Sequence, residues 1–313
     1  MNAAVGLLLY SLAVLAFGPR LLRRLTRAGQ VPRLGVAAWL TAIASVLVTW
    51  VAAAVAVIVD VAGHWNHGHF VAACLAKLLG VAAGDAGMLA RLALIAVATS
   101  AAATAAITVV RLSRTLIRIR RRAHGHAQAV RIVGRRTTDR DVVILEAAKP
   151  AAYCVSGRPP AIVVTTAALT ALDARQLDAV VAHERAHLSG HHPHLVAALR
   201  SLATVFPRIA LITDGAEQVS RLLEMCADDV AACRYGRGAL LSGLLALSGA
   251  APAGALGAAD IDVLARAERL TAPNAQLAVA RSRAALTSAV TVLVAGPLVT
   301  AALAASMLMC GIP

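Results

Sequence analysis

The chain has 313 residues, of which 59% are hydrophobic, with a mean hydropathy of +0.74 and a formal net charge of +14. Intrinsic disorder requires low hydrophobicity and is excluded, and an ordinary soluble enzyme, with about 45–50% apolar residues, is less hydrophobic than this chain. Aromatic residues make up only 3%, too few to build stacking platforms for single-stranded nucleic acid. The remaining class is a membrane protein, or a soluble domain joined to membrane spans.

Four apolar stretches have the composition of membrane-spanning helices, which need about 20 residues. They cover residues 1–18, 34–60, 90–111 and 284–310. Pro297 lies within the last stretch, where a proline can kink a spanning helix without removing it. The first stretch has the alternative of a cleaved signal peptide, but it lacks a basic segment at its start, and its positive charges follow the apolar run. An uncleaved span is therefore the favoured interpretation.

Arginine is unevenly distributed among the segments that join these stretches. Residues 19–33 carry five arginines and residues 111–140 carry ten, whereas the only basic residue between 60 and 90 is Lys77. Positively charged loops stay in the cytoplasm. This predicts a multi-pass protein of the plasma membrane with both termini outside and residues 111–283 in the cytoplasm. The basic linker at 112–140 is expected at the surface of the lipid bilayer, and direct binding of nucleic acid is not expected.

Residues 141–283 are long enough for one globular cytoplasmic domain. Two short β-branched runs, 141–145 and 161–165, predict strands. The pattern then changes to helical spacing over residues 174–189. Asp173 and Gln176 form a capping-box signature before this helix, and a glycine follows it at position 190.

The predicted helix contains His183-Glu184-Arg185-Ala186-His187, which is an H-E-x-x-H pattern. Histidines at i and i+4 project from one face of a helix, so both rings can reach one zinc ion. Glu184 then lies where a carboxylate can accept a proton from a water molecule. The alternative is a surface helix that carries two histidines and a charged pair. The helical context favours the metal site.

A catalytic zinc site of this type needs a third protein ligand. Downstream, Glu224 and Asp228 are spaced i and i+4 in a helix-like stretch over residues 216–233 and therefore share a face. Glu224 is the predicted ligand, in preference to Glu217 or Asp229. Asp228 is the predicted carboxylate that orients a metal-binding histidine. A solvated acidic face is the alternative.

With these two motifs in place, the chain resembles the gluzincin membrane peptidases and most of all the BlaR/MecR-type regulatory metallopeptidases. The H-E-x-x-H at 183–187 and the E-x-x-A-D at 224–228 carry the resemblance, and segments 152–157 and 162–164 resemble the strands that precede the zinc helix. The resemblance implies that His183, His187 and Glu224 bind zinc, Glu184 is the general base, and Asp228 holds a ligand histidine. The implied fold is a multi-pass α-helical membrane protein with a cytoplasmic α+β zincin-like (gluzincin) peptidase domain.

Two features set this chain apart within that resemblance. An Arg-Asp pair often follows the second histidine in such peptidases, whereas this chain has His-His-Pro-His at 191–194. The sequence stops three residues after its last apolar stretch, so the C-terminal sensor domain of BlaR/MecR proteins is expected to be lacking. Three spans before the zinc helix and one after it favour the BlaR/MecR type over HtpX-like proteases, which usually have two and two.

The expected function is therefore that of a zinc metalloendopeptidase that cleaves a cytoplasmic protein in regulatory proteolysis, and the resemblance implies a winged-helix repressor as its substrate. One alternative is an HtpX-like quality-control protease of membrane proteins, and another is a non-enzymatic signalling scaffold with a structural zinc site. Tyr235, His191 and His194 are candidates for the cation that stabilises the oxyanion. The activating signal and the oligomeric state stay open.

Overall fold

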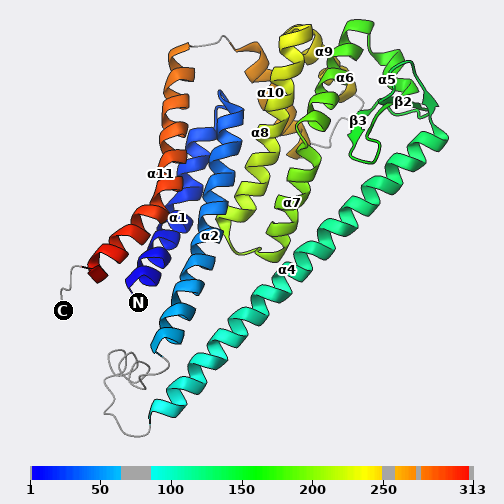
Figure 1. Cartoon of the computed structure of the whole chain (residues 1–313). Coiled ribbons are helices and arrows are strands. Elements are labelled where there is room, and N and C mark those ends of the chain that lie inside the picture. Colours follow the sequence, from blue (N-terminus) through cyan, green and yellow to red (C-terminus); the bar gives the residue numbers. More distant parts are fainter. Residues whose placement is uncertain (1, 65–85, 249–257, 273–275, 310–313) are drawn as a thin grey trace. The chain divides into compact units, whose positions relative to one another are not determined.

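The computed structural model describes residues 2–64, 86–248, 258–272 and 276–309 (Figure 1). The chain forms two compact units. The first comprises residues 1–18, 41–113 and 290–313, and the second comprises residues 19–40 and 114–289.

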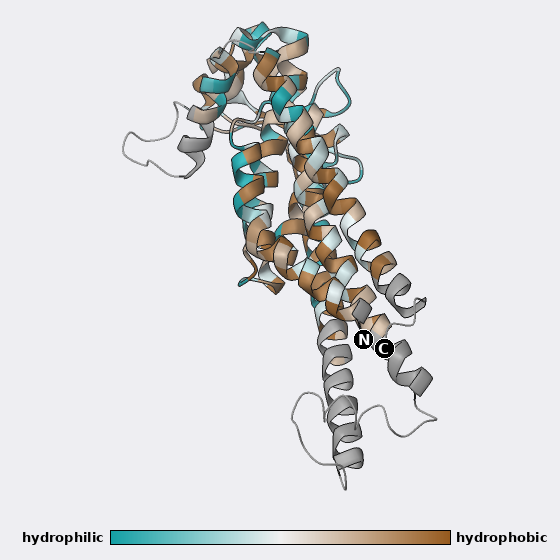
Figure 2. Cartoon of the chain, turned by 90° about the vertical axis from the view of Figure 1, so that its left-hand side faces the viewer, coloured by the Kyte–Doolittle hydropathy of each residue, from teal (hydrophilic) through white to brown (hydrophobic). Residues whose placement is uncertain are grey.

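Four long helices contribute to the first unit: α1 (Asn2–Thr26), α2 (Pro32–His64), α4 (Ala86–Val133) and α11 (Gln276–Met309). Among the described residues, three helical segments are long and apolar enough to cross a membrane, and they lie in α1, α2 and α11. Figure 2 colours the described parts of the helices near the chain termini largely brown, for hydrophobic residues. The predicted spans at 1–18, 34–60 and 284–310 overlap these helices over the described residues 2–18, 34–60 and 284–309.

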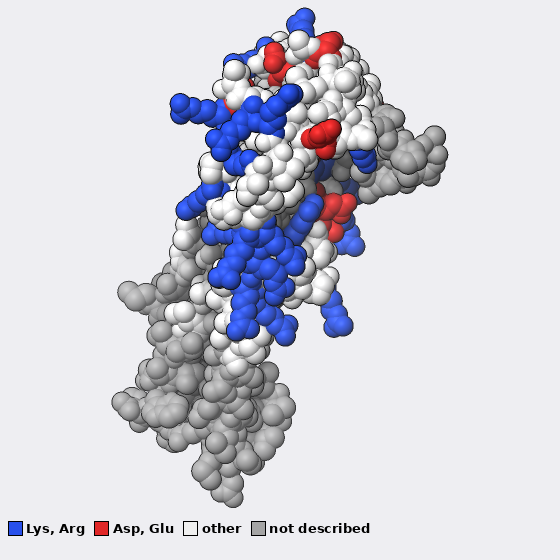
Figure 3. Space-filling model, turned by 90° about the vertical axis from the view of Figure 1, so that its right-hand side faces the viewer, with Lys and Arg blue, Asp and Glu red and all other residues white. Residues whose placement is uncertain are grey.

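The predicted span at 90–111 lies in α4, where most side chains before residue 103 are outside the described part, so this span stays a prediction. The same helix continues to Val133 without a break. Most of the predicted basic linker at 112–140 is therefore helical. Figure 3 shows basic side chains gathered on the face of the molecule along which α4 runs.

A proline in α11 leaves one carbonyl of the first unit without its helical partner. Pro297 has no N–H, so it cannot donate to the carbonyl of Leu293, four residues earlier. The hydroxyls of Tyr10 and Ser45 donate to this carbonyl instead, at 3.1 and 3.0 Å. The ring of Tyr10 also lies so close to Gly296 that an added methyl group would clash with it. A hydroxyl from α1 and one from α2 thus satisfy the backbone of α11.

Tyr10→Phe is expected to destabilise the chain by about 1 kcal/mol, because hydrogen bonds of this kind between membrane helices contribute about 0.6 to 2 kcal/mol. The melting temperature in detergent measures the loss. The Pro297→Ala background is the control, since an alanine N–H at this position restores the helical hydrogen bond and should reduce the effect of Tyr10→Phe. An equal loss in both backgrounds would contradict the role assigned to the tyrosine hydroxyl.

The second unit contains a four-stranded sheet in the order β1-β2-β4-β3. Its strands are β1 (Arg135–Arg136), β2 (Val142–Leu145), β3 (Ala152–Val155) and β4 (Ala161–Thr165). β2 and β4 are parallel, and the other two pairs are antiparallel. The strands predicted at 141–145 and 161–165 are confirmed as β2 and β4. β3 lies at an edge of the sheet.

Both faces of β4 are buried, and side-chain alternation sends its residues into two separate clusters. Ile162 and Val164 pack with apolar residues of α6, whereas Val163 packs with Ala127 and Val130 near the end of α4. The sheet is therefore covered by α6 on one face and by the end of α4 on the other. This explains why the strand reads as a continuous apolar run.

The remaining helices follow the sheet in the chain and complete the second unit. They are α5 (Thr166–Ala171), α6 (Ala174–Ser189), α7 (His192–Val205), α8 (Ala210–Tyr235), α9 (Arg237–Ser248) and α10 (Ala258–Thr271). α6 packs against α8 and α9, and α7 packs against α8. The sheet and these helices agree with the α+β composition expected for the domain at 141–283.

Candidate metal centre

The helix α6 positions both histidines of the H-E-x-x-H pattern. Its start has the predicted capping box, in which Asp173 accepts from the N–H of Gln176, and the Gln176 side chain accepts from the N–H of Asp173. Its apolar side packs on the sheet. His183 and His187 are one turn apart on a buried face, with only 3% and 8% of their surface exposed. The helix thus directs two imidazoles inward, where each needs a polar partner.

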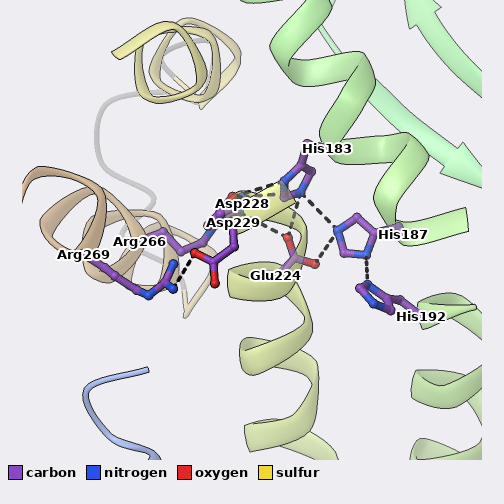
Figure 4. Close-up of polar contacts among 8 residues, drawn as sticks. All are labelled: His183, His187, His192, Glu224, Asp228, Asp229, Arg266 and Arg269. Atoms are coloured by element: carbon purple, nitrogen blue, oxygen red, sulfur yellow. Dashed lines mark hydrogen bonds and ion pairs between the residues drawn. The ribbon is translucent and has the colours of Figure 1, made fainter. Parts of the chain in front are cut away.

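The partners come from α8, which crosses α6 and carries Glu224 and Asp228 one turn apart (Figure 4). Glu224 faces both histidines, with Oε2 at 3.4 Å from Nε2 of His183 and Oε1 at 3.5 Å from Nε2 of His187. The two Nε2 atoms are 3.1 Å apart. The structure therefore brings together the three side chains predicted to bind the metal.

These separations fit a metal ion. Zinc binds histidine nitrogen and carboxylate oxygen at about 2.0 to 2.2 Å, so two tetrahedral ligands lie about 3.3 to 3.5 Å apart. Potential ligand atoms of His183, His187 and Glu224 all lie within 4.8 Å of one another. Burial disfavours the charged form of His183, yet Asp228 and Glu224 raise its pKa to about 9. The two carboxylates therefore favour positive charge at this point, as the residues around a cation site must.

Asp228 is placed where the sequence predicts an orienting carboxylate. Its Oδ1 lies 3.1 Å from Nδ1 of His183, and the residue is 1% exposed. A carboxylate at this nitrogen favours the proton on Nδ1 and leaves the lone pair of Nε2 directed toward Glu224. The geometry is thus compatible with the predicted tautomer of a metal-binding histidine.

Arg266 on α10 is a residue of this centre that the sequence did not indicate. Its guanidinium donates two hydrogen bonds to Asp228, at 2.8 and 2.6 Å, and lies 3.3 Å from Glu224. Burial raises the pKa of the Asp228 carboxyl, but the two hydrogen bonds from Arg266 and the nearby imidazole of His183 lower it, and the net direction is down. The arginine therefore keeps the orienting carboxylate charged inside the protein.

A third histidine, His192, contacts His187 and orients its ring. Nδ1 of His192 lies 3.0 Å from Nδ1 of His187. Burial and the neighbouring His187 lower the pKa of His192 to about 4, so His192 is neutral at pH 7 and can accept a hydrogen bond. His187 then donates through Nδ1 and keeps the lone pair of Nε2 for a cation. The position of His192 depends on the turn at His191, whose φ of 55° is left-handed.

His192→Ala is expected to weaken zinc binding about 10- to 100-fold, because loss of a partner that orients a ligand histidine has effects of this size. Competition with a chelating dye on the full-length protein measures the affinity. His194→Ala is the matched control, since His194 is exposed and its ring lies near that of His191, and it should leave the affinity unchanged. Unchanged affinity in His192→Ala would contradict the orienting role.

A cavity of about 570 Å³ opens beside the three converging side chains. Glu184, His187 and Glu224 line it, together with Tyr153 and Cys154 of the edge strand β3. Burial raises the pKa of the Glu184 carboxyl. A carboxylate of raised pKa is suited to take up a proton near neutral pH.

The lining of this cavity bears on the residues that were predicted to stabilise the oxyanion. Tyr235, His191 and His194, the candidates for oxyanion stabilisation, are absent from the cavity lining, whereas the guanidinium of Arg200 and the neutral imidazole of His192 are present. Tyr235 packs against α6 and α9 in a separate apolar cluster. These three candidates therefore do not line the cavity beside the metal centre, and the identity of the oxyanion-stabilising residue stays a prediction.

Arg185, in the middle of the H-E-x-x-H pattern, faces away from the metal centre. Its guanidinium donates to Asp141 at 2.8 and 2.9 Å and to Asp139 at 3.2 Å. The hydrogen bond from Arg185 holds the pKa of the Asp141 carboxyl below its usual range. This pair joins the metal-binding helix to the start of β2.

The two helices, the converging side chains and the acid beside them in a cavity define the class of metal-dependent peptidases. Within that class the chain belongs to peptidase family M48, whose family model matches residues 113–273, about half of the chain. The match includes α6, α8 and also α10 with Arg266. No curated protein and no solved structure matches the chain.

Proposed function

We propose that this metallopeptidase is a zinc endopeptidase held in the membrane, which cleaves a cytoplasmic protein in regulatory proteolysis of the BlaR/MecR kind. The observation that carries the proposal is the arrangement of His183, His187 and Glu224 around one point, with Glu184 lining the adjoining cavity. These residues supply the ligands and the base that hydrolysis of a peptide bond requires. Membership of family M48 supports the peptidase activity.

His183, His187 and Glu224 would hold the zinc ion. When bound, zinc acts as a Lewis acid that polarises the scissile carbonyl and lowers the pKa of water. Glu184 takes the proton of the attacking water and transfers it to the nitrogen of the leaving amine. Its burial raises its pKa and so favours the protonated state between these two transfers. Asp228 and His192 fix the two imidazole orientations.

The edge strand β3 supports an extended peptide as the substrate. β3 pairs with β4 on one side, and Tyr153 and Cys154 of β3 line the cavity that also contains Glu184. A peptide that adds to a sheet edge gains main-chain hydrogen bonds that are independent of its sequence. An internal segment of a protein can bind in this way, which favours an endopeptidase over an enzyme limited to chain ends.

The arginine distribution supports a cytoplasmic substrate. The basic residues of 19–33 and 111–140 flank apolar helices, and such segments stay on the cytoplasmic side. The peptidase domain at 141–283 would then face the cytoplasm, with both termini outside. A winged-helix repressor is the proposed substrate, in keeping with the resemblance to BlaR/MecR-type peptidases.

The experiment compares the proteome of cells that make the wild-type chain with that of cells that make Glu184→Gln. Regulatory proteolysis predicts that one or a few soluble cytoplasmic proteins accumulate in the variant. Accumulation of many membrane proteins would instead indicate HtpX-like quality control. An unchanged proteome, together with a closed four-ligand zinc site by X-ray absorption, would indicate a non-enzymatic scaffold and refute the proposal.

A further inference from the structure

A second cavity in the same unit is lined almost entirely by arginine. It measures about 400 Å³ and lies between the end of α1 and the helix α8. Its lining consists of Arg20, Arg23, Arg24, Arg27, Gln218 and Arg221. The lining contains no acidic side chain. A concave surface with this many guanidinium groups is suited to an anion.

Four of these arginines lie on one face of the chain at the end of α1. Arg20, Arg23, Arg24 and Arg27 are spaced i, i+3, i+4 and i+7, so their side chains are neighbours. Like charges at this spacing repel one another and destabilise a helix. The negative end of the helix dipole offsets part of the repulsion, although its effect is limited to the last turn. A bound anion would relieve the rest.

The far side of the cavity is held in place by hydrogen bonds. Arg221 of α8 donates to the carbonyl oxygens of Thr26 and Arg27 and to the side chain of Gln218. Arg23 pairs with Asp214. The lining of the cavity itself contains five arginines and no acidic residue. These contacts fix the shape of the cavity.

Phosphate is the anion that best fits such a lining, because the planar guanidinium group binds phosphate oxygens in a bidentate manner. The apolar part of α1 ends at Gly18, two residues before the first of these arginines. If α1 crosses the membrane, the arginines lie at the depth of the lipid headgroups. We propose that this arginine cavity binds the phosphate of an anionic phospholipid headgroup.

The same helix links the cavity to the metal centre. Arg221 precedes Glu224 by three residues on α8, and Gln218 lies one turn further back. A headgroup in the arginine cavity would join the end of α1 to the helix that carries Glu224 and Asp228. Lipid binding would therefore stabilise the helix that holds half of the metal centre. This inference rests on α1 as a membrane span and does not require peptidase activity.

The test uses the full-length protein in detergent, titrated with phosphatidylglycerol while native mass spectrometry counts the bound lipid. Arg20→Gln with Arg24→Gln removes two exposed charges of the cavity, spaced i and i+4. Each arginine near the membrane surface contributes about 1 kcal/mol to binding of anionic lipid, so the affinity should fall about 30-fold. The control is Arg175→Gln with Arg208→Gln, two exposed arginines outside both predicted basic segments, which should retain wild-type affinity.

The measurement overturns the proposal if the cavity variant binds phosphatidylglycerol as tightly as the wild type, or if both double variants lose affinity equally. Inorganic phosphate forms a separate arm. Displacement of the lipid by phosphate at equal concentration would assign the cavity to free phosphate and reject the headgroup. Arg27→Gln alone, with an expected loss of about fivefold, keeps the test decisive if the double variant does not fold.

Discussion

Replacing Glu184 by glutamine is expected to reduce cleavage of a protein substrate by about 10² to 10⁴-fold, the usual contribution of a positioned general base. Glutamine has nearly the same shape but cannot take up a proton. His183, His187 and Glu224 are unchanged in this variant, so the zinc content should stay at the wild-type level. Cleavage of a casein-type protein in detergent and metal analysis of the same sample measure the two quantities.

Glu217→Gln is the matched control for this variant, because it makes the same chemical change at an exposed position of α8. It should keep both activity and zinc. Wild-type cleavage by Glu184→Gln would show that another group acts as the base. Loss of zinc together with activity would show that the side chain is needed to build the site, and the assignment of Glu184 as a base would fail.

Replacing Arg266 by methionine is expected to destabilise the protein by about 3 to 5 kcal/mol. Asp228 is 1% exposed and receives two hydrogen bonds from this arginine, so methionine would leave a buried carboxylate without its main counter-ion. Removal of one partner of a buried ion pair has a cost of this size. For a unit of this length, the melting temperature should fall by about 10 °C or more.

The double variant Arg266→Met with Asp228→Asn separates this effect from a general loss of packing. Asparagine removes the charge that methionine leaves unpaired, so the double variant should be more stable than Arg266→Met alone. Arg208→Met removes an exposed arginine and should change stability by less than about 0.5 kcal/mol. If Arg266→Met melts at the wild-type temperature, the guanidinium does not stabilise the buried carboxylate.

Local sequence signals predicted the parts of the site that lie within single helices. Helical spacing and the capping box identified α6, and the structure confirms both the box and the end of the helix at Gly190. The i, i+4 rule placed His183 with His187, and Glu224 with Asp228, on common faces. These predictions work because one turn of helix fixes which side chains are neighbours.

Contacts between distant segments could not be predicted in the same way. Arg266 lies 38 residues after Asp228 and is one of 30 basic residues in the chain. A buried aspartate indicates that a cation must lie nearby, but not which one. His192 was visible as part of an unusual His-His-Pro-His segment. Its contact with His187 depends on the left-handed turn at His191, which the sequence pattern does not specify.

The long helix α4 shows a different limit of sequence patterns. Its apolar half predicted a span, and its arginine-rich half predicted a basic cytoplasmic linker. Arginine is a good helix former, and Ala127 and Val130 provide an apolar face that packs on the sheet. The helix therefore continues beyond its apolar segment, because helix formation depends on residue propensity and on packing as well as on the length of the apolar segment.

The replacement of a helical hydrogen bond by two hydroxyls at Pro297 has a consequence for how related chains diverge. Positions 10, 45, 296 and 297 are coupled, because Pro297 frees the carbonyl that the hydroxyls at 10 and 45 bind, and Tyr10 leaves no space for a side chain at 296. A relative with an ordinary residue at 297 is free to lose the hydroxyls at 10 and 45. A relative with a side chain at 296 must carry something smaller than tyrosine at 10. These four positions should therefore co-vary.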